Sequence, residues 1–448
     1  MTNENANSMI FPSDFLWGTA TAAHQIEGGN DNNNWALFEK EAGRIHNGDI
    51  SGFACDHWNR FEEDCELMTQ LNQNSYRMSM EWSRIFRDKD TIDDSALDRY
   101  EEIIDTLIAR NITPFVTLHH FTYPIWWDRQ GGLMNRSNSH LEHFARFCRL
   151  LGERFKDKVV YWNTINEIDI VAICGFFEGS HPPAKKSFAK TFKATNTLLK
   201  MHQIAYQCLK EINPDFKVGL VHNMPIVRPL RNNSLTDKLT AKLADYMFNG
   251  SVINGLKKGK LIGQFLGSEE GLKDSTDFLG LNFYHPVITS PKIPGLAVTA
   301  TEKPLCGKDN LCVGLDWEAY PEGMLLALRR FNEEFPGLPM YITENGIGTE
   351  NDEWRQKLMI DHLKICHQAI QEGIDLKGYF HWSLLDNFEW AEGYSSRFGL
   401  VEVDFNSQKR TVKGSGTLYG DISRNNGLTS EILDKFPEDI YRPDFAQP

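Results

Sequence analysis

The sequence predicts an α/β fold, a (β/α)8 TIM barrel built from residues 1–448 as a single domain. Three observations support it. Eight short apolar runs recur along the chain, helical patterns lie between them, and polar and aromatic side chains collect where the runs end. An open doubly wound sheet is the alternative, but it more often has about six strands and a Gly-rich first turn. Here the first run leads into HQIEGGN, which lacks the G-x-G-x-x-G spacing.

The eight apolar runs are the predicted strands of the barrel. They are nearly continuous in apolar residues, which is typical of parallel strands that are covered on both faces. The predicted strands occupy residues 15–21, 75–80, 114–120, 159–166, 217–223, 277–284, 339–344 and 378–385.

Two of the segments between these runs have clear helical periodicity. Residues 95–110 carry an apolar stripe that extends to Ile108, and residues 140–155 repeat apolar side chains at spacings of three and four. Ser139 and Glu142 predict a capping box at the start of the second helix. Strands that alternate with helices in this way favour a parallel barrel.

Three further segments are expected to lie outside this repeat. Residues 1–10 are polar and Asn-rich, and we expect a flexible N-terminal tail. Residues 286–316 contain Pro and Gly and predict a long loop after the sixth strand, where barrel enzymes shape the entrance to their site. The Gly-rich stretch 414–420 predicts a turn.

Composition excludes several classes of partner. With 47 Lys and Arg against 61 Asp and Glu, the formal net charge is −14, which makes nucleic acid a poor partner. We find no basic segment followed by an apolar stretch at the N-terminus, and no apolar run of about 18 residues, so we expect neither a secretory signal nor a membrane span. The 8 cysteines form no C-x-x-C pair and predict reduced thiols in a cytoplasmic protein.

Polar and aromatic side chains gather at the predicted carboxyl ends of the strands, where barrel enzymes carry their site. The set contains amides, an imidazole, a guanidinium, carboxylates and large rings. Its members are Gln25, Arg77, His120, Asn166, Glu167, Asn282, Tyr284, Glu344, Trp382, Glu389 and Trp390.

Two of these carboxylates, Glu167 and Glu344, end the fourth and seventh predicted strands, roughly across the barrel mouth. Glycoside hydrolysis needs such a pair, because one carboxyl group protonates the leaving oxygen and the other attacks the sugar or activates water. A single strand-end Glu could equally form an ion pair with a basic residue. Two strand-end Glu residues among the polar and aromatic side chains named above favour a catalytic pair.

Eight motifs appear along the chain in a characteristic order. They are FLWGTATAAHQIEG (15–28), YRMSMEWSRI (76–85), TLHHFTYPIW (117–126), NTINE (163–167), LGLNFY (279–284), YITENG (341–346), HWSLLDNFEW (381–390) and GYSSRFGLVEVDF (393–405). With these motifs the chain resembles glycoside hydrolase family 1, the β-glucosidase family, over nearly its whole length. The family's fold is the barrel already inferred.

The resemblance implies a retaining β-glycosidase that hydrolyses terminal non-reducing β-D-glucosides through a covalent glycosyl–enzyme. β-D-Galactosides and β-D-fucosides are further expected substrates. The partners implied are small-molecule β-glycosides and oligosaccharides, with no metal and no organic cofactor, and a homo-oligomer is left open. A transglycosidase with the same two Glu residues is one alternative. An inactive sugar-binding protein is another, but it should have lost one of the pair.

Roles follow from the resemblance residue by residue. Glu344 is expected to be the nucleophile, and Glu167 the acid and then the base. Arg77, Asn282 and Tyr284 are expected to support this pair. Sugar binding is assigned to Gln25, His120, Asn166, Trp382, Glu389 and Trp390. A carboxylate at Glu389 repels a 6-phosphate, so unphosphorylated glycosides are expected.

Two positions depart from the family pattern. Ile168 stands where the family has proline after the acid, which restores a backbone N–H donor and adds bulk on the leaving-group side. Phe121 stands where tryptophan is more usual, and its smaller ring is expected to broaden the range of sugars accepted.

Overall fold

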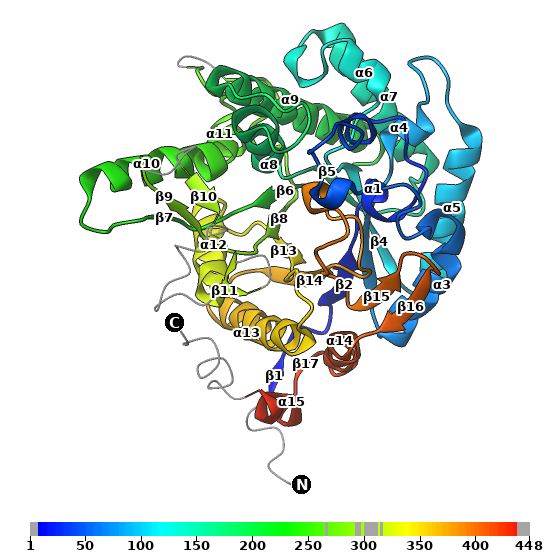
Figure 1. Cartoon of the computed structure of the whole chain (residues 1–448), viewed down its shortest axis with the longest axis vertical. Coiled ribbons are helices and arrows are strands. Elements are labelled where there is room, and N and C mark those ends of the chain that lie inside the picture. The colour runs from blue at the N-terminus through cyan, green and yellow to red at the C-terminus, as the bar shows by residue number, and fades with distance from the viewer. Residues whose placement is uncertain (1–7, 265–267, 292–296, 300–311, 314–316, 437–448) are drawn as a thin grey trace.

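A closed parallel barrel forms the centre of the molecule in the computed structural model, which describes residues 8–264, 268–291, 297–299, 312–313 and 317–436 (Figure 1). Its strands follow the order β13-β14-β2-β3-β4-β5-β6-β8 around the barrel. They are β2 (Leu16–Ala20), β3 (Ser75–Ser79), β4 (Thr113–His119), β5 (Tyr161–Asn166), β6 (Lys217–Asn223), β8 (Phe278–Asn282), β13 (Met340–Asn345) and β14 (Leu376–Trp382). All eight predicted strands are therefore confirmed, with small shifts at their ends.

A helix follows each barrel strand before the next one begins, and together these helices surround the barrel (Figure 1). In chain order they are α3 (His57–Gln70), α5 (Asp94–Ala109), α7 (Asn138–Arg154), α9 (Phe188–Ile212), α11 (Ser251–Lys258), α12 (Pro321–Glu334), α13 (Asp352–Gln371) and α14 (Gly414–Arg424). None of the helices within the described residues is long and apolar enough to cross a membrane.

Short helices and small sheets lie in the connections between the barrel strands and these helices. The short helices are α1 (Ala23–Ile26), α2 (Asn34–Phe38), α4 (Trp82–Ile85), α6 (Ile125–Arg129), α8 (Ile168–Ile173), α10 (Leu235–Asp245) and α15 (Ser430–Lys435), with π-helical turns at Cys174–Glu178 and Tyr246–Gly250. The small sheets pair β1 (Met9–Ile10) with β17 (Gly427–Leu428), β9 (Val287–Thr289) with β7 (Val227–Pro229) and β10 (Ala297–Thr299), β11 (Cys312–Val313) with β12 (Trp317–Glu318), and β15 (Val401–Asp404) with β16 (Lys409–Val412).

All three segments expected outside the repeat carry more structure than predicted. The flexible tail was wrong for Met9 and Ile10, because they pair antiparallel with Leu428 and Gly427. Residues 1–7 lie outside the described residues. The predicted loop 286–316 contains strand β9, and its positions 292–296, 300–311 and 314–316 also lie outside them.

The predicted turn at 414–420 was also wrong, since helix α14 begins there. Asp352 supports its first turn by accepting hydrogen bonds from the backbone N–H and the hydroxyl of Ser415. Gly416 lies against the backbone of Leu400, where a Cβ atom would come within 2.8 Å of the carbonyl oxygen. The glycines of this stretch therefore serve close packing rather than a turn.

Helices α5 and α7 occupy the predicted positions with two differences. Ile108 of α5 is 42% exposed, so the buried stripe ends at Leu107. The capping box was wrong, because α7 begins after Ser137, which makes no side-chain cap bond. Glu142 instead forms an ion pair with Arg149, which lies about two turns further along the same face of the helix.

An aromatic cluster fills the end of the barrel at which the strands begin. The ring of Phe115 in β4 lies 4.8 Å from that of Tyr161, 5.3 Å from Phe278, 5.2 Å from Tyr341 and 5.1 Å from Phe380, measured between centroids. Such contacts stabilise the core beyond the burial of their area. This end of the barrel is therefore solid, and the functional groups collect at the opposite end.

We predict that Phe115→Ala lowers the free energy of unfolding by about 3–5 kcal/mol, because it empties a space that four other rings enclose. Denaturant titration measures this change. Phe53→Ala is the control, since that ring is 79% exposed, and it should change stability by no more than about 0.5 kcal/mol. A loss below about 1 kcal/mol for Phe115→Ala would show that the neighbouring rings close the space.

Candidate active site

The carboxylate of Glu344 lies at the end of β13, where it forms an ion pair with the guanidinium of Arg77 from β3. Arg77 also donates to the carbonyl of Thr343 at 3.1 Å and to Asn166 Oδ1 at 2.6 Å. The hydroxyl of Tyr284 donates to the other oxygen of Glu344 at 2.7 Å. Arg77 is fully buried and Glu344 is 4% exposed, so each charge depends on the other for compensation.

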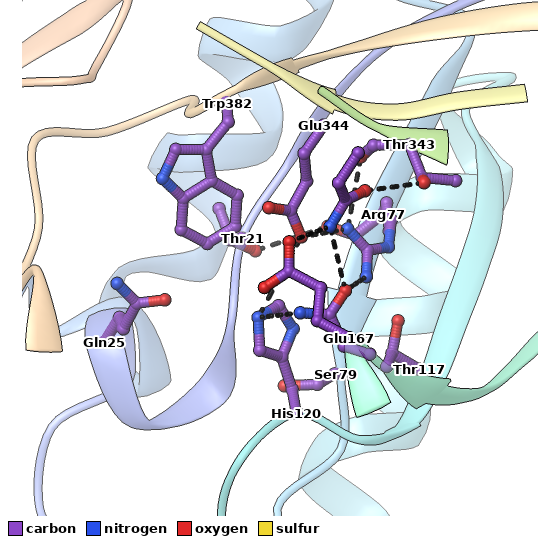
Figure 2. A network of polar contacts seen from close by, with 12 residues as sticks. Thr21, Gln25, Arg77, Ser79, Thr117, His120, Glu167, Thr343, Glu344 and Trp382 are labelled. Atoms are coloured by element: carbon purple, nitrogen blue, oxygen red, sulfur yellow. Dashed lines mark hydrogen bonds and ion pairs between the residues drawn. The ribbon is translucent and has the colours of Figure 1, made fainter. Parts of the chain in front are cut away.

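Asn282 connects this ion pair to Glu167. Its Oδ1 accepts a hydrogen bond from the Thr343 hydroxyl at 2.7 Å, which leaves its Nδ2 to donate to Glu167 Oε1 at 2.8 Å and Asn166 Oδ1 at 3.2 Å. In Figure 2 the side chains of Glu167 and Glu344 point into the same region, with Arg77 on one side and Trp382 on the other. Residues from four strands thus converge in one network.

The backbone at Glu167 turns its side chain into the barrel. Glu167 follows β5 directly and has φ 51° and ψ 70°, in the left-handed region that non-glycine residues seldom adopt. Holding a residue there costs of order 1–3 kcal/mol, and such strain concentrates at functional sites. Helix α8 starts at the next residue, Ile168, which is completely buried.

The two carboxyl groups have different electrostatic surroundings. Burial raises the pKa of Glu167 well above its usual range, and the negative charge of Glu344 raises this pKa further. The amide of Asn282 and the more distant charge of Arg77 oppose the rise. Since Arg77 contacts Glu344 directly, the geometry favours an ionised Glu344 beside a protonated Glu167.

His120 is held as a neutral imidazole at the end of β4. Asn166 uses its Oδ1 to accept from Arg77, so its Nδ2 donates to His120 Nε2 at 3.1 Å. Burial lowers the pKa of His120 well below its usual range, and the charge of Arg77 lowers it further. The remaining hydrogen therefore lies on Nδ1, a buried atom without a hydrogen-bond partner among the described residues.

A second polar group comes from the loops after β2 and β14. Gln25 Nε2 donates to Asn387 Oδ1 at 3.0 Å and to the Phe388 carbonyl at 2.9 Å, which orients the amide, and Gln25 Oε1 is buried with no hydrogen-bond partner in the described chain. The Trp382 indole N–H lies 3.4 Å from Glu389 Oε2. Burial raises the pKa of Glu389 to about 8. Hydrogen-bond donors and hydrogen-bond acceptors therefore lie together at this end of the barrel.

These groups surround a cavity of about 510 Å³ at the carboxyl ends of the strands. Trp390 lies 4.6 Å from Trp35 and 4.9 Å from Phe121 between ring centroids, so its ring is fixed by packing. Seven of the predicted site residues line the cavity: His120, Glu167, Tyr284, Glu344, Trp382, Glu389 and Trp390. Gln25, Arg77, Asn166 and Asn282 are fully buried directly behind this lining.

The sequence analysis missed much of the outer wall. This part is formed by Ile170, Cys174, Glu178, Ser180, His181, Asn223, His285, Trp317, Ala391, Glu392 and Phe398. Most of these residues lie beyond the strand ends, in connections whose course the apolar runs do not reveal. Within the described residues, no three His, Cys, Asp or Glu side chains are grouped so that they could hold a metal ion.

Comparison with known proteins places this site in a family. Residues 7–428 match the profile of glycosyl hydrolase family 1. β-Glucosidase A of Thermotoga maritima is 38% identical over 94% of this chain and 99% of its own.

Two similar solved structures have the same barrel. A β-glycosidase from Pyrococcus horikoshii has a TM-score of 0.87 at 37% identity and covers 96% of this chain and 99% of its own. The family 1 β-glucosidase of Thermotoga maritima in complex with isofagomine lactam has a TM-score of 0.86 at 36% identity, over 94% of this chain and 100% of its own. The chain therefore belongs to glycosyl hydrolase family 1.

Proposed function

We propose that the protein is a retaining β-glycosidase that removes terminal β-D-glucosyl residues, with Glu344 as nucleophile and Glu167 as acid and base. The observation that carries the assignment is the contrast between two buried carboxyl groups at one cavity. Glu344 is compensated by Arg77 and Tyr284, whereas Glu167 has an amide partner and a raised pKa. A retaining mechanism needs an ionised nucleophile and a protonated acid in this arrangement.

In the first step a Glu344 oxygen attacks the anomeric carbon and forms an ester bond to the sugar. The bond from that carbon to the leaving oxygen breaks, and this oxygen takes the proton of Glu167. In the second step water attacks the anomeric carbon, gives a proton to the Glu167 carboxylate and releases Glu344. Esterification removes the Glu344 charge, so the pKa of Glu167 falls when the residue must act as a base.

The polar groups around the cavity are suited to sugar hydroxyls, which both donate and accept hydrogen bonds. His120 offers an N–H, Gln25 offers a carbonyl oxygen, and Glu389 offers a carboxyl group. Asn166 lies beside the acid, where it can reach the 2-hydroxyl. The rings of Trp382 and Trp390 complete the wall. The relative from Thermotoga maritima named a β-glucosidase supports glucose as the sugar.

Unphosphorylated glycosides are favoured over 6-phosphates. Glu389 places a carboxyl group at the cavity. Arg397, the arginine that follows it in the sequence, forms its contacts outside the cavity. Arg397 lies 3.8 Å from Asp386 and donates to the carbonyl of Val403 at 3.4 Å. It does not line the cavity within the described part of the chain.

We expect Glu344→Gly to lower kcat for an aryl β-D-glucoside by about 10⁴-fold or more, because no glycosyl ester can form. Steady-state release of the aryl alcohol measures the loss. Glu350→Gly is the matched control, since Glu350 is exposed in the connection that follows β13. Full hydrolysis by Glu344→Gly would disprove the nucleophile assignment.

Glu167→Gln tests the acid. For substrates with poor leaving groups, kcat/KM should fall by about 10²–10⁴-fold, whereas a 2,4-dinitrophenyl glucoside, which needs little protonation, should lose far less in its first step. In the unmodified protein kcat/KM should also fall as pH rises through the raised pKa of Glu167, because the acid loses its proton. This alkaline limb should disappear in Glu167→Gln. An unchanged rate on poor leaving groups would contradict the assignment.

A further inference from the structure

A buried chain of polar side chains lies behind Glu167, and the proposed reaction does not use it. Asn249 Oδ1 lies 3.3 Å from His222 Nε2, His222 Nδ1 lies 3.5 Å from Asp169 Oδ1, and Asn223 Nδ2 lies 3.3 Å from Asp169 Oδ2. Asn249 is 0% exposed, and Asp169 and His222 are 1% exposed. Asn223 is the last of these side chains and lies in the wall of the cavity.

The direction of hydrogen bonding is fixed at Asn249. Its Nδ2 donates to the carbonyl of Pro225 at 3.1 Å and to Asp245 Oδ1 at 2.8 Å. A carbonyl oxygen accepts hydrogen bonds only, and the Asp245 carboxylate is paired with Arg330. Asn249 Oδ1 therefore faces His222, and His222 Nε2 must carry a hydrogen.

One proton must then lie between His222 and Asp169. Neither His222 Nδ1 nor Asp169 Oδ1 has a hydrogen-bond partner among the described residues. Two bare acceptors buried against each other would both lose their hydration without a replacement. The pair is thus either a carboxylic acid with a neutral imidazole or a carboxylate with an imidazolium. Burial raises the pKa of Asp169 well above its usual range and lowers the pKa of His222 to about 4, which favours the first form.

Both forms leave Asp169 Oδ2 as an acceptor, so both orient Asn223 in the same way. Asn223 must donate with its Nδ2, and its Oδ1 is the polar atom left for the cavity. Asn223 ends β6, which pairs with the strand that leads to Glu167. Gln25 and Glu389 follow β2 and β14, on the far side of the barrel. The Asn223 oxygen therefore lies on the side of the leaving group.

We propose that Asp169 and His222 are positioning residues that share one proton and hold the Asn223 carbonyl oxygen as a hydrogen-bond acceptor for the leaving group. This inference rests on the proposed function. This hydrogen bond stabilises leaving groups that carry hydroxyl donors, as the second sugar of a β-linked disaccharide does. An aryl leaving group without hydrogen-bond donors is not stabilised by it.

The test compares kcat/KM for cellobiose with kcat/KM for 4-nitrophenyl β-D-glucoside. In Asp169→Leu the cellobiose-to-aryl ratio should fall about tenfold, the effect of one lost hydrogen bond. In Asp169→Asn the ratio should stay within about twofold of the original, because the asparagine amide can donate to His222 and accept from Asn223. Asp237→Leu is the matched control, since this buried aspartate bonds Arg231 and Ser290 away from the cavity.

Two measurements keep the inference testable if Asp169→Leu does not fold. Asn223→Ala removes the acceptor directly and should reproduce the fall in the ratio. Nitrogen NMR of the unmodified protein should show His222 with its hydrogen on Nε2 and Nδ1 as an acceptor. An unchanged ratio in both variants, or a bare Nε2, would overturn the inference. If the unmodified chain cleaves neither substrate, the proposed function fails, and the His222 spectrum still decides where the proton lies.

Discussion

The ion pair between Arg77 and Glu344 is the interaction on which the rest of the site depends. An arginine inside a barrel strand needs a carboxylate, because an uncompensated buried charge costs about 3–5 kcal/mol. Once Arg77 contacts Glu344, its remaining donors fix Thr343 and Asn166. The amide of Asn282 and the ring of His120 are then oriented in turn. One charge pair thereby sets the hydrogen-bond direction of side chains from five strands.

The same pair makes two chemically identical carboxyl groups different. Arg77 contacts Glu344 and not Glu167, so the Glu344 charge raises the pKa of Glu167 by more than the more distant Arg77 charge lowers it. Because that charge is consumed and regenerated during the proposed reaction, the proton affinity of Glu167 follows the covalent state of Glu344. The acid and base roles then need no conformational change.

The barrel strands and the inner site could be predicted because they obey simple local rules. Buried parallel strands are continuous apolar runs, and several polar residues that end such runs at one edge of a barrel together indicate a site. The start of α7 could not be predicted in detail, since Ser137 and Ser139 are equally good caps and tertiary packing decides between them. Strand β1 and helix α14 depend on partners far away in the sequence. Asp169 and His222 were missed for the same reason, because only the fold brings an ordinary aspartate and an ordinary histidine together.

The aromatic cluster around Phe115 gives the molecule a blind end. Since the described residues close that end of the barrel, a glycoside chain that enters from the opposite end does so by its tip, so units are removed one at a time from that tip. This closed end also imposes an order of departure. The leaving group lies nearest the exit and must go first, water enters by the path that it vacates, and the sugar held deepest leaves last. A freed sugar that lingers there competes with the next substrate for the same space.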